Sequence, residues 1–381
     1  MKKILLMLLC LSFLAISPKA FASEDPLSKP NNKFGIHILF PSELDDAKRL
    51  VNSSGGDWGY VVIPIQSGDK DLEKWQSFMD KARDNHLIPI LRLATEGDYF
   101  HTNFWRRPQE TDILDFANFL NSLTWPTKNR YIIVFNEVNR GDEWGGAADP
   151  AYYAQLLSYS VTVFKSLNPD FFIISSGLDN AAPNKGTEYI NEYSYLEGMN
   201  EAVPGIFNQI DGVASHSYPN PGFSQAPSVK TQESITSFDY ERSLIAQMTS
   251  KRLPIFITET GWSNTSINDD KRADYYKQAF STVWNDSDIV TVAPFLLKAS
   301  GPFAQFSFLN DDNSESKQYA MFRNLPKTKG TPELTKQVLA ASTLEQEPVP
   351  KSFIEDKKSD QTDPPRVSKL LRDTFAWVMR L

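Results

Sequence analysis

Cysteine is almost absent from this sequence. The one cysteine among 381 residues, Cys10, lies in an N-terminal segment that we expect to be removed. The remaining chain would then hold no thiol, which excludes disulfides, thiol catalysis and cysteine-ligated metals. Histidine is also scarce, with four residues and no H-E-x-x-H or comparable cluster. The sequence therefore predicts neither a metal site nor a cofactor.

An excess of basic residues is lacking too. The chain has 39 Lys and Arg against 47 Asp and Glu, a formal net charge of -8. Nucleic-acid binding requires a basic surface, so the charge argues against that class of partner. Neither a glycine-rich fingerprint after the first strand nor a G-x-S-x-G elbow occurs. These absences argue against dinucleotide-binding and phosphate-loop folds and against serine hydrolases.

The N-terminus has the features of a targeting segment. Lys2 and Lys3 precede a largely apolar run over residues 4–16, and residues 20–22 (Ala-Phe-Ala) offer a small-x-small cleavage site. The run is shorter than the ~20 residues that a membrane-spanning helix needs. We therefore expect a signal peptide over residues 1–22 and a secreted, periplasmic or cell-surface protein. An uncleaved membrane anchor is the alternative.

Short apolar runs of strand-forming residues recur along the chain. There are eight of them, at residues 34–39, 60–65, 87–93, 131–135, 171–175, 211–215, 255–258 and 289–297. They begin roughly 37 residues apart, the spacing of a repeated strand-helix unit with some enlarged loops. The runs are apolar on both faces, as in parallel strands covered by helices.

Helical patterns lie between these runs. One such stripe consists of Leu72, Trp75, Met79 and Ala82, which fall on one helical face. Ser42 with Asp45 predicts a capping box for the first helix, which Gly55-Gly56 would end. Asp149 and Pro150 predict the start of a later helix. Strands and helices thus alternate, which predicts an α/β fold, a closed (β/α)8 TIM barrel rather than an open doubly wound sheet.

The composition changes near the C-terminus. We expect the barrel over residues 33–330, a polar, proline-containing linker over 331–365 and a basic amphipathic helix over 366–381. Two roles for this helix stay open. It either covers apolar surface on the barrel or on a second subunit, or it adsorbs to an anionic membrane or envelope surface.

Two carboxylates follow predicted strands. Glu137 comes directly after the fourth apolar run, and Glu259 ends the seventh. The active site of a (β/α)8 barrel lies at the C-terminal ends of its strands. Partial desolvation there raises the pKa of a carboxylic acid. A pair of carboxylates can cleave a glycosidic bond, because one protonates the leaving oxygen while the other attacks the anomeric carbon.

At these positions the sequence resembles the clan A glycoside hydrolases, over about residues 33–330. Asn136-Glu137 is similar to their Asn-Glu pair after strand four, and Glu259 to their Glu after strand seven. The resemblance implies a retaining mechanism with Glu137 as general acid/base and Glu259 as nucleophile. It also implies that Asn136 donates to the sugar hydroxyl next to the reacting carbon.

A third match lies after the sixth run, where His216-Ser217-Tyr218 is similar to the His-x-Tyr of many clan members. Tyr218 would orient Glu259, and His216 would support the acid/base or a bound sugar. Arg92, at the end of the third run, would favour the charged form of Glu259. A structural salt bridge for Arg92 and a buried core histidine for His216 are the alternatives. His37, which ends the first run, is expected near the barrel mouth.

Aromatic residues near these strand ends are candidate platforms for a sugar ring. Trp144 and Trp262 each follow a predicted catalytic carboxylate, and Tyr99, Phe100 and Trp105 belong to the loop after the third run. In the cellulase-like family five, strand eight commonly ends in a Trp. Here Phe295 takes that place, a departure from the family pattern. The residues Glu-Thr-Gly-Trp also resemble the β-1,3-glucanases of family seventeen.

The sequence thus predicts a glycoside hydrolase that cleaves β-linked oligo- or polysaccharide by double displacement through a glycosyl-Glu259 intermediate. Carbohydrate is the expected partner. Transglycosylation at the same site, a non-catalytic carbohydrate-binding barrel and a metal-dependent deacetylase or phosphodiesterase are the alternatives.

Overall fold

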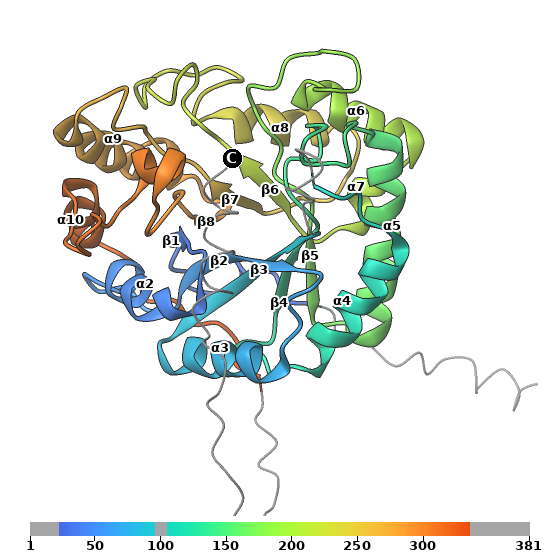
Figure 1. The fold of residues 1–381 in the computed structure, drawn as a ribbon, viewed down its shortest axis with the longest axis horizontal. Coiled ribbons are helices and arrows are strands. Elements are labelled where there is room, and N and C mark those ends of the chain that lie inside the picture. The colour runs from blue at the N-terminus through green and yellow to red at the C-terminus, as the bar shows by residue number, and fades with distance from the viewer. Residues whose placement is uncertain (1–22, 96–104, 336–381) are drawn as a thin grey trace, which may run out of the picture.

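The computed structural model describes residues 23–95 and 105–335, and its core is a ring of parallel strands surrounded by helices (Figure 1). The strands in the described residues are β1 (Gly35–His37), β2 (Gly59–Gln66), β3 (Leu87–Ala94), β4 (Arg130–Ile133), β5 (Phe171–Ile174), β6 (Val213–His216), β7 (Ile255–Glu259) and β8 (Ile289–Val292). Each begins within two residues of a predicted run. The eighth ends five residues early, because Pro294 has no N–H with which to continue the ladder.

The strands form two hydrogen-bonded sheets, β1-β2-β3-β4-β5 and β6-β7-β8. Single parallel bridges join the two sheets, Ile174 to Gly212 between β5 and β6 and Phe34 to Val292 between β1 and β8. Within the described residues, the strands of each sheet pair in parallel with their neighbours in sequence. The arrangement is the predicted (β/α)8 barrel.

Helices form the outer ring (Figure 1). The α-helices are α2 (Leu44–Val51), α3 (Leu72–Asp84), α4 (Glu110–Ser122), α5 (Pro150–Leu167), α6 (Glu192–Ala202), α7 (Ile206–Gln209), α8 (Ser237–Ile245), α9 (Asp269–Ser281) and α10 (Lys317–Asn324). Short 3-10 turns are η2 (Pro41–Glu43), η3 (Val283–Asn285) and η4 (Gly301–Phe306). These helices cover the outward faces of the strands, which explains why the strand sequences are apolar throughout.

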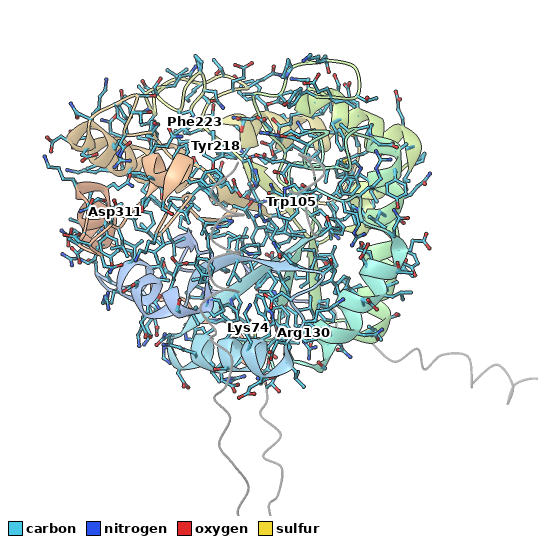
Figure 2. All side chains as sticks on the ribbon, viewed as in Figure 1. Lys74, Trp105, Arg130, Tyr218, Phe223 and Asp311 are labelled. Carbon is cyan, nitrogen blue, oxygen red and sulfur yellow. The ribbon has the colours of Figure 1, made fainter. Side chains whose placement is uncertain are left out.

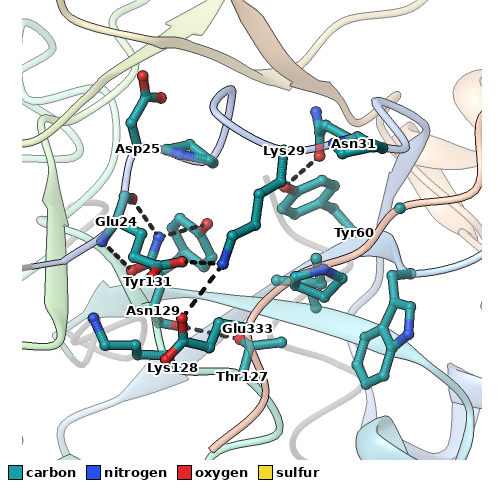
Figure 3. A pocket seen from close by; sticks show the side chains of 16 residues that line it. Glu24, Asp25, Lys29, Asn31, Tyr60, Thr127, Lys128, Asn129, Tyr131 and Glu333 are labelled. Atoms are coloured by element: carbon teal, nitrogen blue, oxygen red, sulfur yellow. Dashed lines mark hydrogen bonds and ion pairs between the residues drawn. The ribbon is translucent and has the colours of Figure 1, made fainter.

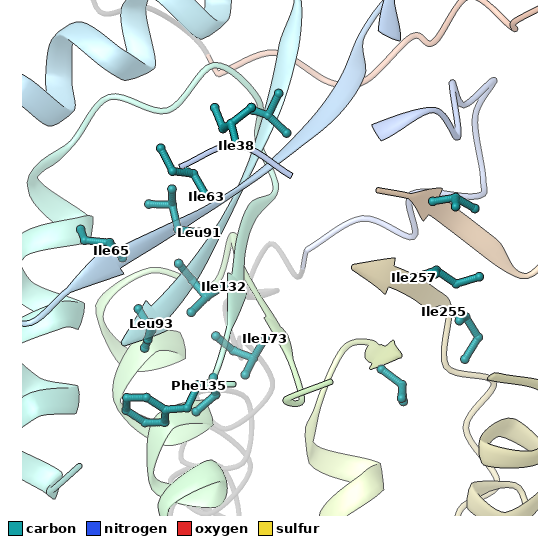
Figure 4. Close-up of a cluster of buried hydrophobic side chains, with 14 of the residues drawn as sticks. Ile38, Ile63, Ile65, Leu91, Leu93, Ile132, Phe135, Ile173, Ile255 and Ile257 are labelled. Carbon is teal, nitrogen blue, oxygen red and sulfur yellow. The ribbon is translucent and has the colours of Figure 1, made fainter. Parts of the chain in front are cut away.

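The buried side chains divide into two layers because successive strand residues point to opposite faces. Tyr60 and Val62 of β2 point into the barrel, where they meet Tyr131 and Phe256. Residues of the opposite parity point outward and pack under the helices, and Ile63 is one of them. Figure 4 shows this outer layer on β2 to β5 and on β7. Both layers hold the strand ends, and hence the loops of the mouth, in place.

Helix capping agrees with the sequence at one predicted position and differs at another. The Asp149 carboxylate accepts a hydrogen bond of 3.0 Å from the Tyr152 N–H at the start of α5, as predicted. The expected Ser42 capping box is wrong. Glu43 instead accepts from the backbone N–H of Leu39 at 2.7 Å, so η2 precedes α2, and α2 ends at Val51, before Gly55.

Residues before and after the barrel cover its floor, the end that holds the strands' N-termini (Figure 3). The Glu24 N–H donates to the Asn129 side-chain oxygen at 2.9 Å, and Lys29 forms ion pairs with Glu24 and Glu333. The Lys128 N–H donates to the Glu333 carbonyl at 2.7 Å. Residues before the predicted boundary at 33 and after the one at 330 thus contact the floor of the barrel.

The predicted signal peptide, the C-terminal helix, Tyr99 and Phe100 lie outside the described residues. Residues 336–365 of the predicted linker do so as well. In the part of the chain that the structure describes, no helix is long and apolar enough to span a membrane.

Candidate active site

The predicted polar residues meet at the carboxyl ends of the strands. Arg92 lies on β3, Glu137 follows β4, His216 ends β6 and Glu259 ends β7. Tyr218 follows β6 and lies beside Phe223, with ring centroids 5.2 Å apart (Figure 2). Residues far apart in the sequence thus form one cluster, because parallel strands present all their carboxyl ends to the same face of the barrel.

Glu137, His216 and Glu259 form the centre of this cluster. One ligand-type atom of each lies within 4.8 Å of the corresponding atoms of the other two. The His216 Nδ1 atom is 3.0 Å from Glu137 Oε1 and 3.8 Å from Glu259 Oε2. One oxygen of Glu137 and one oxygen of Glu259 therefore lie within 4.8 Å of each other, so the two carboxyl groups face the same small space.

Glu259 is the more buried of the two carboxylates, and polar groups hold it on several sides. The Arg92 guanidinium donates to Glu259 Oε1 at 3.1 Å, and the Tyr218 hydroxyl donates to Oε2 at 3.1 Å. His37 Nε2 lies 3.6 Å from Oε1. Arg92 also donates to the side-chain oxygen of Asn136. These contacts fix the orientation of Glu259.

The backbone around Glu137 adopts a conformation that residues other than glycine rarely occupy. Phe135 and Glu137 have φ values of 68° and 37°. The Glu137 N–H donates to the Gly177 carbonyl at 3.0 Å, which holds this conformation. A Cβ atom on Gly177 would lie 2.2 Å from the His216 ring. The chain thus accepts local strain to bring Glu137 and His216 together, as is common at functional sites.

The charges around Glu137 differ from the sequence expectation. Burial raises the pKa of this carboxyl, but the hydrogen bond from His216 and then the charge of Arg140 outweigh burial and lower the pKa to about 2. The expectation of a raised pKa is therefore wrong for Glu137. The reason is that partial desolvation is offset by two nearby proton-bearing groups.

The pKa values of the two histidines of the cluster are shifted in opposite directions. Burial lowers the pKa of His216, but the charges of Glu259 and Glu137 outweigh burial and raise the pKa above its usual value. Burial, and then the charge of Arg92, lower the pKa of His37 well below its usual value. The site therefore favours the protonated form of His216 over that of His37, and His216 Nδ1 is one hydrogen bond from Glu137.

Sequence reasoning missed two further groups at the mouth, both in the loop after β4. Arg140 lies 3.5 Å from Glu137 Oε2 and also pairs with Asp179 and Asp142. Glu143 lines a pocket with Arg92 and Asn136. Their position three and six residues after Glu137 was the available signal, but the direction of a loop side chain depends on a turn that the sequence pattern did not predict.

The predicted sugar platforms at Trp144 and Trp262 are wrong. Both side chains are fully buried, so neither ring offers a face to a ligand. Trp144 packs against Phe135 and other rings of the core, and Trp262 packs against Tyr276. Both tryptophans are core residues that pack beneath the loops of the mouth.

Phe295 and Trp105 keep part of their surface exposed. Phe295 lies where the resemblance places an aromatic residue, with its ring 5.2 Å from the ring of His37. Trp105 is half-buried and lines the same pocket as Glu143. Among the members of the predicted set that the structure describes, these two rings keep a surface that a ligand could reach.

The three central side chains also have the spacing of a metal site. Cations already occupy their surroundings, since Arg92 pairs with Glu259 and Arg140 with Glu137. A divalent ion between these carboxylates would be repelled by both guanidinium groups. The arrangement fits proton transfer and nucleophilic attack better than metal binding.

No protein-family model matches the chain, and no curated protein matches its sequence. Solved structures do. A family 39 glycoside hydrolase from Bacteroides cellulosilyticus is 18% identical with a TM-score of 0.55, covering 80% of this chain and 65% of that chain. This chain thus spans about two thirds of the length of that protein.

Two other families give similar values. A family 128 endo-β-1,3-glucanase from Sorangium cellulosum is 15% identical with a TM-score of 0.51, covering 78% of this chain and 98% of that chain. A family 5 protein from Streptomyces cattleya, solved with Manβ1-4GlcNAc, is 13% identical with a TM-score of 0.52, covering 75% and 74%. The chain thus has the barrel fold of clan A glycoside hydrolases, as the sequence predicted.

Proposed function

We propose that this protein is a retaining glycoside hydrolase that cleaves β-linked oligo- or polysaccharides. The observation that carries the proposal is the separation of 4.8 Å or less between carboxylate oxygens of Glu137 and Glu259. Retaining enzymes place these groups about 5–5.5 Å apart, whereas inverting enzymes leave about 6.5–9.5 Å for a water molecule. The fold shared with glycoside hydrolases supports the same conclusion.

In the first step, a Glu259 oxygen forms a bond to the anomeric carbon while the bond from that carbon to the leaving oxygen breaks. Glu137 gives its proton to the leaving oxygen. Arg92 and Tyr218 hold Glu259 in the orientation needed for this attack. Asn136, which Arg92 holds, is placed to bind the hydroxyl beside the reacting carbon.

We infer that His216 supplies the proton for this step, because the site favours its protonated form and its Nδ1 atom lies 3.0 Å from Glu137 Oε1. The charge of Glu259 is the largest of the influences that raise the pKa of His216. As Glu259 becomes an ester, that charge disappears, so His216 passes its proton to Glu137 while Glu137 protonates the leaving oxygen. After this step His216 is neutral and Glu137 is ionised, so Glu137 can act as the base that activates water in the second step.

We further propose that the protein is exported, with the segment before residue 23 removed. N-terminal sequencing of the mature protein tests this part, and a first residue of Ser23 is expected. The polar mouth described above would then meet glycans outside the cytoplasm.

Activity on aryl β-glycosides and on a panel of β-linked polysaccharides tests the proposal. Proton NMR during hydrolysis should show that the first product has the anomeric configuration of the substrate. Product of opposite configuration would contradict the retaining assignment. Activity that persists after dialysis against EDTA is expected, and its loss would favour the metal-dependent alternative.

A further inference from the structure

Glu143 is a carboxyl group at the mouth that the mechanism above does not use. It lies in the loop between β4 and α5 and lines a pocket together with Arg92 and Asn136. Phe135 and Trp105 are among the residues that give this pocket its apolar wall. The pocket therefore adjoins Glu259, because Arg92 both lines the pocket and donates to Glu259.

The loop that carries Glu143 is fixed in position. The Trp105 N–H donates to the Asp142 carbonyl at 2.7 Å, and the Gly145 N–H donates to the Trp105 carbonyl at 2.8 Å. The ring of Trp144 is buried beneath the loop. Backbone hydrogen bonds on either side of Glu143 thus hold the backbone of this loop in place, which helps to preorganise a binding residue.

The Glu143 carboxyl is half-buried, and within residues 23–95 and 105–335 it has no hydrogen-bond or ion-pair partner. Burial, and then the charge of Glu137, raise the pKa of Glu143 to about 8. At neutral pH the group is therefore an uncharged acid with one O–H donor and free acceptor oxygens. Polar groups in such surroundings normally have a partner, which a ligand in the pocket would supply.

We propose that Glu143 is a substrate-binding residue that recognises hydroxyl groups of a neutral sugar unit lying across the opening of this pocket, beside Asn136. The inference rests on the proposed function and adds the class of sugar. Arg92 is already paired with Glu259, so the pocket offers hydrogen bonds but no unpaired charge to an acidic or amino sugar. Two neighbouring hydroxyls of a pyranose match the donor and acceptor of one carboxylic acid.

Glu143 belongs to the binding of substrate rather than to bond cleavage, because Glu137 and Glu259 already supply the proton and the nucleophile. Its loss should therefore raise KM and leave kcat nearly unchanged. The loss of a hydrogen bond in a buried site, with a ligand group left unpaired, should raise KM about tenfold.

The test compares Glu143→Ala and Glu143→Gln with wild type on hexasaccharides of β-1,4-linked glucose, β-1,3-linked glucose and β-1,4-linked xylose. We expect Glu143→Ala to raise KM about tenfold with kcat within about threefold, and Glu143→Gln, which keeps a donor and an acceptor, to stay near wild type. The matched control is Glu188→Ala, an exposed carboxylate paired with Lys185. Its KM should not change.

An unchanged KM in a Glu143→Ala variant with wild-type melting temperature would overturn the inference, and so would a loss confined to kcat. Calorimetric binding of the hexasaccharides to Glu259→Gln, with and without Glu143→Ala, separates this inference from the proposed function. Binding that weakens with Glu143→Ala although wild type cleaves no glycan would support Glu143 and contradict the hydrolase. Neither binding nor cleavage would overturn both.

Discussion

The hydroxyl of Tyr218 donates a hydrogen bond of 3.1 Å to Oε2 of Glu259, and both groups are buried. Removing this donor from a charged acceptor costs about 1.5–3 kcal/mol. We therefore expect Tyr218→Phe to lower kcat about 10- to 100-fold while the fold is kept. The control is Tyr240→Phe, which removes a hydroxyl that donates to the Lys230 carbonyl on the outer surface. Equal activity of the two variants would show that Tyr218 does not position Glu259.

The two carboxylates should be separable by the leaving group of the substrate. Glu259→Ala is expected to abolish turnover on every substrate, because no glycosyl-enzyme can form. Glu137→Ala should lose about 10²–10⁴-fold on natural glycans but keep activity on aryl glycosides whose leaving group needs no proton. Added azide should react with the glycosyl-enzyme of Glu137→Ala and yield a product of retained configuration. Equal loss by Glu137→Ala on all substrates would mean that the assigned roles are wrong.

The pH profile should report the proton that His216 and Glu137 share. The pKa of His216 is raised, so activity is expected to persist above the usual histidine pKa and to fall as pH rises through the shifted value. His216→Asn removes that proton reservoir and also the hydrogen bond that lowers the pKa of Glu137 most, so the pKa of Glu137 should rise from about 2 but remain that of a carboxyl group. The alkaline limb of kcat/KM against pH should then move to lower pH. An alkaline limb that stays in place in His216→Asn would contradict the proton route.

A pH-dependent effect on stability is expected behind β6. Glu192 is buried, and burial followed by the charge of Glu241 raises its pKa well above the usual value. The stability linked to Glu192 is present below the unfolded pKa and is lost as pH rises toward the folded one. Glu192→Gln should therefore raise the melting temperature at pH 7 by a few degrees, since about 1 kcal/mol corresponds to about 2–4 °C, and should change it little at pH 4.

Glu197→Gln is the matched control for this measurement, because Glu197 is an exposed residue of the same helix. Its melting temperature should follow wild type at both pH values. A gain at pH 4 equal to the gain at pH 7 would show that the effect on Glu192 comes from packing and not from its ionisation.

The barrel could be predicted because the strands are short runs that are apolar on both faces. Parallel strands covered by helices have this pattern. The same logic located Arg92, Glu137, His216 and Glu259. Residues at the carboxyl ends of parallel strands all lie at the same end of the barrel. It failed for Trp144 and Trp262. Distance along the sequence from a carboxylate says nothing about burial, and large rings in these loops gain more by packing inward than by facing solvent.

Residues whose role depends on loop conformation were beyond a pattern-based argument. Arg140 and Glu143 follow Glu137 closely, but the turn that directs them to the mouth begins with positive φ values at Phe135 and Glu137. The sequence pattern contains no glycine there to signal such a turn. The contacts of Glu333 on the barrel floor were missed for a similar reason, because a polar, proline-containing segment can pack as well as link.

Lys29 and Glu333 are paired on the barrel floor, at the opposite end from Glu137 and Glu259. The two limits of the described chain, residues 23 and 335, thus both lie at the floor of the barrel. The protein could be attached to a resin, a fused partner or a surface through either segment beyond these limits. The attachment would then lie at the floor of the barrel, opposite Glu137 and Glu259. The mouth would remain turned toward the surroundings, so an immobilised form should reach long, insoluble polymer chains as readily as the free protein does.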